Sequence, residues 1–210
     1  MSVVVAIKKD GKVYLGADSQ VTKGGTRQTL KNPNNYKIWK VKNADHCLMA
    51  HVGAVRDANV VRTIGHLVDE IALLRHEVNY DLVVRDIVPH ILQQLQAFGY
   101  VAKEEGKCFE GMDSEFLFAF EDRLFHISRD GCVIEVDDSI AIGSGACEAI
   151  GSILSTPPAE KPGKRIVRAI KASAANDIYV DYPIILTNTD TTEFQVIYER
   201  QEDESKGEKE

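Results

Sequence analysis

The second residue of the chain is a serine, and it stands directly before the apolar run Val3, Val4 and Val5. Methionine aminopeptidase removes an initiator methionine when the next residue is small, so Met1 is expected to be lost. Ser2 would then carry both a hydroxyl group and a free α-amine, whose pKa is about 8. Such an amine works as a general base at neutral pH and can activate the hydroxyl of its own residue. The N-terminus is therefore a candidate nucleophile for covalent catalysis.

Other residue types that often serve chemistry show no pattern that would define a second site. The six histidines have no ligand spacing and are interpreted as scattered surface or core residues: His46, His51, His66, His76, His90 and His126. Cys147 follows a Gly-Ser-Gly turn and is interpreted as a small buried helix residue. The glycine-rich segment TKGGTRQ lacks the Gly-Lys-Ser/Thr ending of a phosphate-binding loop. The sequence therefore predicts neither a metal site nor a cofactor.

The composition is that of a globular protein of moderate size. A chain of 210 residues, of which 44% are hydrophobic and 27% charged, is long enough to bury one full core. Its formal net charge of −7 argues against nucleic acid or an anionic membrane as the main partner. Lys8, Lys9 and Asp10 interrupt the first apolar run, so no signal peptide is expected. No stretch approaches the roughly 18 apolar residues that a membrane span needs.

Cysteine usage adds an expectation about the compartment. The four cysteines lie far apart and form neither a CxxC pair nor a zinc-binding pattern: Cys47, Cys108, Cys132 and Cys147. We interpret them as reduced thiols, because a disulfide framework in a secreted domain would show closer and more regular spacing. Together with the lack of a signal peptide, this favours a cytoplasmic protein.

Two periodicities alternate along the chain. Runs with strand character occur at residues 3–7, 13–15, 36–41, 46–53, 115–120, 124–128, 132–136, 140–143, 182–190 and 193–199. Helical spacing predicts a long helix over 54–74, a second over 82–98 with a kink or start near Pro89, and helices over 146–154 and 164–177. The segment 22–35 is predicted to be loop from its glycine, asparagine and proline content.

The order of strands, two helices, strands, two helices and strands defines the fold class. Two antiparallel sheets between two helix layers satisfy this order, which gives an α+β protein with a four-layer αββα sandwich. Residues 1–199 are predicted to form one domain, and the charged segment 200–210 a disordered tail. A strand that begins at Ser2 would bring the chain terminus into the sandwich, although termini usually lie frayed at the surface. That placement makes sense if the terminus itself has a function.

Five motifs, in order along the chain, carry a resemblance to a known family. They are the N-terminal strand with Ser2 followed by GADSQ with Asp18, NYKIWKV with Lys37, HVGAVRDA with Gly53, IAIGSGA with Ser144, and NDIYV with Asp177. Together they resemble the proteasome β-type peptidases, most closely the bacterial HslV group, which belong to the N-terminal nucleophile hydrolases. The resemblance extends over nearly the whole chain. The usual nucleophile of that family is threonine, whereas this chain has serine.

The resemblance implies a role for each matched residue. Lys37 would be a buried cation that favours the ionised nucleophile hydroxyl, and Asp18 would pair with it so that its burial is tolerable. The amide of Gly53 would stabilise the tetrahedral oxyanion, a contribution of about 3 kcal/mol for one donor. Ser144 and Asp177 would hold the α-amine in a hydrogen-bonded position.

The resemblance also implies an assembly and a substrate. Identical subunits would form a ring or an open spiral around an inner chamber in which polypeptides are cleaved. The chain shows no ATPase motif, so a separate ATPase would have to unfold the substrates. Two other functions stay open: an N-terminal nucleophile amidase acting on small amides, or a catalytically silent ring scaffold that keeps Met1.

Overall fold

The first β-hairpin of the chain lies at the centre of one sheet. The computed structural model describes residues 2–100 and 111–198. The first sheet has the order β10-β1-β2-β11-β12, and its antiparallel strands are β1 (Val3–Lys9), β2 (Lys12–Ala17), β10 (Ser139–Gly143), β11 (Ile184–Asn188) and β12 (Gln195–Ile197). Because β10 pairs with β1, the Gly-Ser-Gly turn after β10 lies beside the start of the chain.

The second sheet follows the chain more directly. It has the order β5-β6-β7-β8-β9, and its antiparallel strands are β5 (Ile38–Lys40), β6 (Cys47–Gly53), β7 (Ser114–Phe120), β8 (Arg123–Ile127) and β9 (Val133–Glu135). Each strand pairs with the next one in sequence, which is the meander that the closely spaced strand runs predict.

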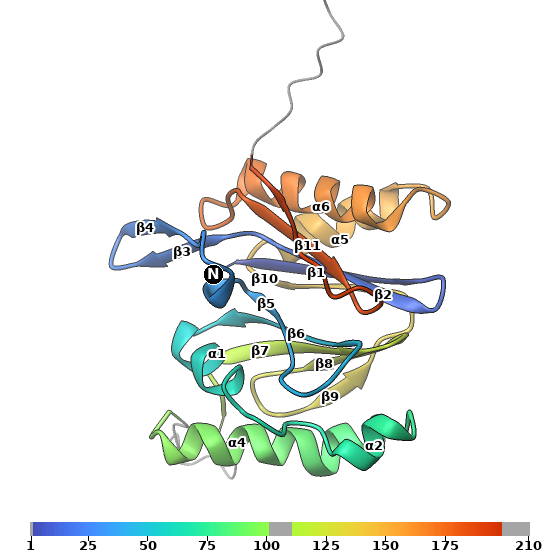
Figure 1. Ribbon diagram of the computed structural model, residues 1–210. Helices are drawn as coiled ribbons and strands as arrows, with labels where there is room; N and C mark the ends of the chain where they lie inside the picture. Colours follow the sequence, from blue (N-terminus) through green and yellow to red (C-terminus); the bar gives the residue numbers. More distant parts are fainter. Residues whose placement is uncertain (1, 101–110, 199–210) are drawn as a thin grey trace, which may run out of the picture.

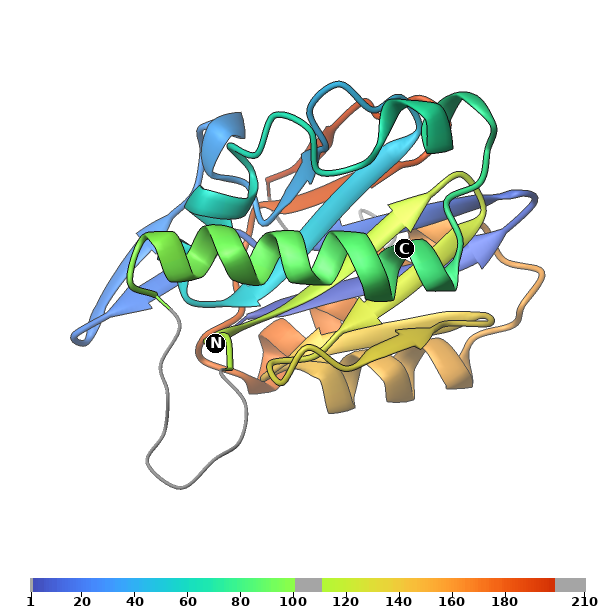
Figure 2. The same ribbon diagram turned by 90° about the horizontal axis from the view of Figure 1, so that it is seen from below.

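Helices cover the outer faces of both sheets, so the protein has four layers (Figure 1). The helices are α1 (Val55–Val61), α2 (Glu70–Leu74), α3 (Tyr80–Leu82), α4 (Val88–Ala97), α5 (Ala146–Ser155) and α6 (Pro162–Asn176). α5 and α6 cover the first sheet, and Figure 2 shows α4 lying across the second. The predicted αββα sandwich is confirmed.

Strand β1 is buried on both faces. Val4 and Ala6 contribute to the core between the two sheets, whereas Val3, Val5 and Ile7 pack toward α5 and α6. This two-sided burial explains why the run is apolar without alternation. Fully burying one valine side chain contributes roughly 1.5–3 kcal/mol, so the strand that leads from Ser2 is firmly fixed.

The predicted long helix over 54–74 is wrong, because two shorter helices occupy this stretch. α1 ends at Val61, and the hydroxyl of Thr63 donates to the Val60 carbonyl at 2.7 Å. Asp69 then starts α2, since its side chain accepts hydrogen bonds from the amides of Ile71 and Ala72. Local side-chain hydrogen bonds thus interrupt an apolar spacing that is continuous in the sequence.

The prediction for the helix around Pro89 is confirmed. A π-helical segment, Val83–Ile87, precedes α4, and Pro89 lies in the first turn of α4. The helical backbone runs through Pro89 without a break, and the wider π-helical turn directly before it is where the regular α-helical hydrogen bonding is interrupted.

The loop predicted over 22–35 is also wrong in part. β3 (Gln20–Lys23) and β4 (Thr26–Thr29) form a two-stranded hairpin that projects from the sandwich (Figure 1). Gly24 and Gly25 connect the strands with φ of 56° and 79°. Two positive φ values are typical of the tight turn that matches strand twist, so the Gly-Gly pair is a hairpin signal rather than a loop signal. Pro33–Asn35 form a short 3-10 helix beyond it.

Some expectations fall outside the described residues or are untested there. The predicted tail 200–210 and Cys108 lie outside them, and the single-domain interpretation of 1–199 stays a prediction. Cys147 lies in α5 but is exposed, so its interpretation as a buried residue is wrong. Across residues 2–100 and 111–198, no helix combines the length and apolar character that crossing a bilayer requires. The same ranges contain no cluster of histidine, cysteine and acidic side chains suited to a metal ion.

Candidate active site

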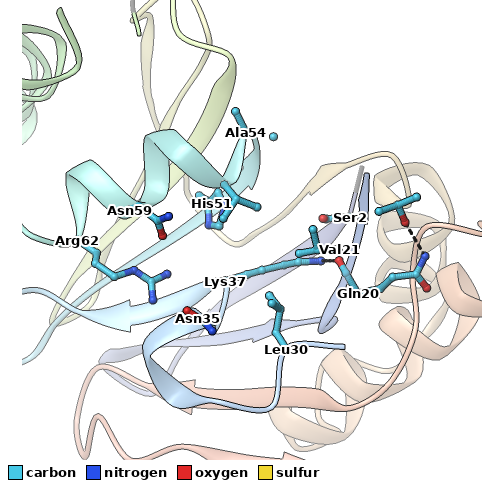
Figure 3. Close-up of a pocket in the computed structure, with 13 residues that line it drawn as sticks. Ser2, Gln20, Val21, Leu30, Asn35, Lys37, His51, Ala54, Asn59 and Arg62 are labelled. Atoms are coloured by element: carbon cyan, nitrogen blue, oxygen red, sulfur yellow. Dashed lines mark hydrogen bonds between the residues drawn. The ribbon is translucent and has the colours of Figure 1, made fainter. Parts of the chain in front are cut away.

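The start of β1 faces a cavity of about 180 Å³ (Figure 3). Its walls come from the β3 strand, the segment before β5, the end of β6 and helix α1. The cavity is lined by Ser2, Gln20, Val21, Thr22, Leu30, Asn35, Lys37, His51, Gly53, Ala54, Val55, Asn59 and Arg62. Three of the residues singled out in the sequence, from three separate motifs, therefore face one space.

The Gly-Ser-Gly turn after β10 holds the backbone of Ser2. The amide of Ser2 donates to Ser144 Oγ at 3.1 Å, and the Ser2 carbonyl accepts from the Gly145 amide at 3.3 Å. Gly143 has a φ of +100°, and a Cβ atom there would lie 2.2 Å from the Ser2 carbonyl oxygen. The turn can approach Ser2 this closely only with glycine at that position. On its other side, Ser173 Oγ donates to the Gly145 carbonyl at 2.7 Å.

A buried ion pair lies beside Ser2. Lys37 Nζ donates to Asp18 Oδ1 at 2.7 Å and to the Gln20 carbonyl at 2.6 Å. Asp18 also accepts from the Val3 amide and from the Gln20 amide, both at 2.9 Å. The side chains of Lys37 and Asp18 are 3% and 0% exposed. Asp18 therefore links the lysine to the residue that follows Ser2.

Burial and two carboxylates act in opposite directions on the pKa of Lys37. Burial lowers the pKa of Lys37 below its ordinary value of 10.5, while Asp18 and, at longer range, Asp177 act to raise it. Figure 3 shows the lysine side chain extending toward Ser2 and Gln20. A cation at this position favours an ionised hydroxyl on a neighbouring residue.

Gly53 ends β6 with a φ of +117° and lines the cavity. A Cβ atom there would lie 2.4 Å from the Asp113 carbonyl oxygen and 2.7 Å from Ser114 Cα, both of which are backbone atoms. Substitution would therefore strain the backbone and force the neighbouring strand β7 to move.

Gly53→Ala is expected to lower the free energy of unfolding by about 2–5 kcal/mol, from backbone strain and overpacking together. Gly151→Ala is the matched control, because Gly151 lies within α5 and a Cβ there meets open space. That variant is expected to gain about 0.5–1 kcal/mol, since alanine favours the helix. Urea unfolding of both variants measures the difference. Equal effects of the two substitutions would contradict the close approach at Gly53.

Asp177 is not joined to Ser2 by the hydrogen bonds of the described residues. It caps the end of α6, where Oδ1 accepts from the Tyr179 amide at 2.9 Å. Its other oxygen, Oδ2, is buried and has no hydrogen-bond partner in the described part of the chain. Asp177 acts on the site electrostatically, because its charge raises the pKa of Lys37.

Sequence reasoning did not find four other contributors to the cavity. Gln20 acts through its backbone carbonyl, which leaves no signal in the side-chain type. His51, Asn59 and Arg62 line the wall opposite the β3 strand. The spacing of His51 gives no sign of a place in the site, yet burial and the nearby cations lower its pKa to about 3, so the imidazole is neutral.

An αββα sandwich with a buried lysine–aspartate pair beside the residue that precedes its first strand is the arrangement of the N-terminal nucleophile hydrolases. Within that class, the chain belongs to the proteasome subunit family, which it matches over residues 2–156. This family is the peptidase branch of the class, so the protein is a peptidase of the N-terminal nucleophile type.

Known proteins similar to the chain agree with this assignment. The ATP-dependent protease subunit HslV of Caldicellulosiruptor saccharolyticus is 28% identical over 193 residues, which cover 86% of this chain and 93% of that protein. Among solved structures, Thiobacillus denitrificans BPH has a TM-score of 0.66 at 18% identity, covering 89% of this chain and 96% of that one. A Gly-1 mutant of Anbu from Hyphomicrobium sp. strain MC1 has a TM-score of 0.69 at 17% identity, covering 96% and 89%. At these identities, the solved structures support the fold alone.

Proposed function

We propose that the protein cleaves peptide bonds with Ser2 as its N-terminal nucleophile after Met1 has been removed. The observation that carries this proposal is the arrangement around Ser2. The buried Lys37–Asp18 pair is tied to the next residue through the Val3 amide, and Ser144 Oγ lies 3.1 Å from the Ser2 nitrogen. Loss of Met1 converts that nitrogen from a peptide N–H into a free α-amine. The amine then has a hydrogen-bonding hydroxyl already beside it.

In the acylation step, Ser2 Oγ attacks the carbonyl carbon of the scissile peptide bond. The hydroxyl proton passes through a bridging water molecule to the α-amine, which becomes an ammonium group. The Gly53 amide donates to the oxyanion that forms, while Lys37 stabilises the developing negative charge. The C–N bond then breaks, and the leaving amine takes the proton from the ammonium group. The product of this step is an ester on Ser2.

In the deacylation step, the neutral α-amine acts as the base a second time. It removes a proton from a water molecule, whose oxygen attacks the ester carbonyl. Ser2 Oγ leaves with the proton, and the free carboxylic acid departs. Ser144 and Asp177 are proposed to keep the amine oriented, Ser144 by direct contact and Asp177 through the charges around Lys37.

We further propose that identical subunits assemble into a ring or an open spiral in the cytoplasm. The support is the similarity to a relative named as a subunit of an ATP-dependent protease. That name also favours a separate ATPase partner that delivers unfolded polypeptides. Multi-angle light scattering tests the assembly: a particle many times heavier than the 23.3 kDa chain is expected. A stable monomer at micromolar concentration would contradict it.

Substrate choice separates this proposal from the two alternatives. The purified protein is expected to hydrolyse fluorogenic peptide amides and to leave small acyl amides of the same leaving group unchanged. An N-terminal nucleophile amidase would show the reverse preference. A silent scaffold would retain Met1 and hydrolyse neither substrate.

A further inference from the structure

The charges that line the cavity beside Ser2 are unbalanced. Two cationic side chains, Lys37 and Arg62, line the cavity, whereas the lining contains no aspartate or glutamate. Lys37 is already paired with Asp18. Arg62 has no carboxylate within 4.0 Å in the described ranges, so its positive charge faces the cavity without a counter-ion.

The guanidinium of Arg62 is held in place and only partly hydrogen-bonded. Nη2 donates to the Tyr36 carbonyl at 2.7 Å, and the group lies over the Trp39 ring with 4.8 Å between Cζ and the ring centroid. Nε and Nη1 are buried and find no hydrogen-bond acceptor among residues 2–100 and 111–198. A buried donor without a hydrogen-bond partner is destabilising, and more so when the group is charged.

Apart from Arg62 and from Lys37, which is paired with Asp18, no side chain of the cavity lining carries a charge. His51 is neutral, and Asn59, Val21 and Leu30 carry no charge. Figure 3 shows the Arg62 guanidinium pointing toward the space around Asn35 and Lys37. The volume of about 180 Å³ is comparable with the roughly 150 Å³ of an engineered cavity that binds benzene, so one side chain fits.

The reaction geometry identifies the substrate residue whose side chain enters the cavity. Ser2 and Gly53 both line this cavity, so the carbonyl under attack lies at its mouth. The carbonyl carbon is bonded to the Cα of the residue immediately before the cleaved bond. That Cα carries the side chain of the same residue. Its side chain is therefore the one that enters the cavity.

We propose that Arg62 selects peptides with a carboxylate side chain, glutamate or aspartate, on the residue immediately before the cleaved bond. This inference rests on the proposed function of Ser2. The carboxylate pairs with the guanidinium where Arg62 lines the cavity, and it supplies the counter-ion that the cavity lacks. Hydrogen bonds between ionised partners are about twice as strong as neutral ones, so the selectivity between glutamate and its neutral isostere glutamine should be large.

The test uses two fluorogenic peptides that differ only in glutamate or glutamine before the cleaved bond. The wild-type protein is expected to favour the glutamate peptide in kcat/KM by about tenfold or more. Arg62→Met and Arg62→Gln should both lose this preference, whereas Arg62→Lys should keep part of it. Arg56→Met is the matched control, because Arg56 lies on α1, which Arg62 directly follows, pairs with Asp113 and does not line the cavity. Equal cleavage of both peptides by the wild type would overturn the inference.

A binding measurement keeps the inference separate from catalysis. Ser2→Ala protein is titrated with the same two peptides, and fluorescence anisotropy gives each Kd. The glutamate peptide is expected to bind about tenfold more tightly, and the added substitution Arg62→Gln should remove the difference. If the wild type cleaves neither peptide but this Kd ratio appears, the proposed function fails and the selectivity stands. Equal Kd values would overturn the selectivity even if both peptides are cleaved.

Discussion

Ser2→Ala is expected to lower kcat/KM for peptide hydrolysis by at least about a thousandfold, because the attacking oxygen is lost. The free energy of unfolding should change by no more than about 0.5 kcal/mol. The hydrogen bonds of Ser2 to Ser144 and Gly145 use its backbone nitrogen and carbonyl, so they survive the substitution. A fluorogenic peptide assay and urea unfolding measure the two effects on the same preparation.

Ser2→Thr is the matched control for that loss. Threonine keeps the hydroxyl, and its β-methyl group restricts the side-chain rotamer. Activity should therefore be preserved or raised relative to the wild type. Ser2→Ala protein that hydrolyses peptides at the wild-type rate, free of contaminating protease, would refute the nucleophile assignment.

Lys37→Met is expected to damage both activity and stability. Removing the cation beside Ser2 should lower kcat/KM by about a hundredfold to a thousandfold, because the developing charge loses its electrostatic support. It also leaves Asp18 as a buried carboxylate without its partner, which costs about 3–5 kcal/mol of folding free energy. Peptide hydrolysis and urea unfolding measure the two losses.

A double variant separates the two effects of Lys37. Adding Asp18→Asn to Lys37→Met removes the uncompensated charge, so part of the stability should return while activity stays low. In the wild type, kcat/KM should also fall as the pH rises through the pKa of Lys37, which burial holds below 10.5. Full activity in the double variant would show that Lys37 has only a structural role.

Much of the fold could be predicted because the strands carry strong local signals. The hairpin of β1 and β2 is marked by an apolar run and an Asp-Gly turn, and the meander of β6 to β9 by closely spaced apolar runs. Periodicity alone predicts one helix over 54–74, because apolar residues recur across this stretch without a break. The side chains of Thr63 and Asp69 form local hydrogen bonds that interrupt the helix. The spacing of apolar residues carries no information about these hydrogen bonds.

The sequence predicts those residues of the candidate site whose role depends on the type of their side chain. Ser2, Asp18 and Lys37 were found through motifs, and the structure joins the last two in an ion pair. The contribution of Gln20 is a backbone carbonyl, which any residue type could supply. Arg62 lines the cavity from the end of α1, and no short motif encodes that tertiary placement.

The central claim is that the hydroxyl and the free α-amine of Ser2 act as one catalytic unit. It is tested most directly by expressing the protein with a removable N-terminal extension whose cleavage leaves Ser2 as the first residue. Peptide hydrolysis is measured on the same preparation before and after cleavage, and intact mass verifies the N-terminus. We predict that the rate rises by at least about a hundredfold when Ser2 is freed, because the general base then exists. Equal rates before and after cleavage would contradict the account.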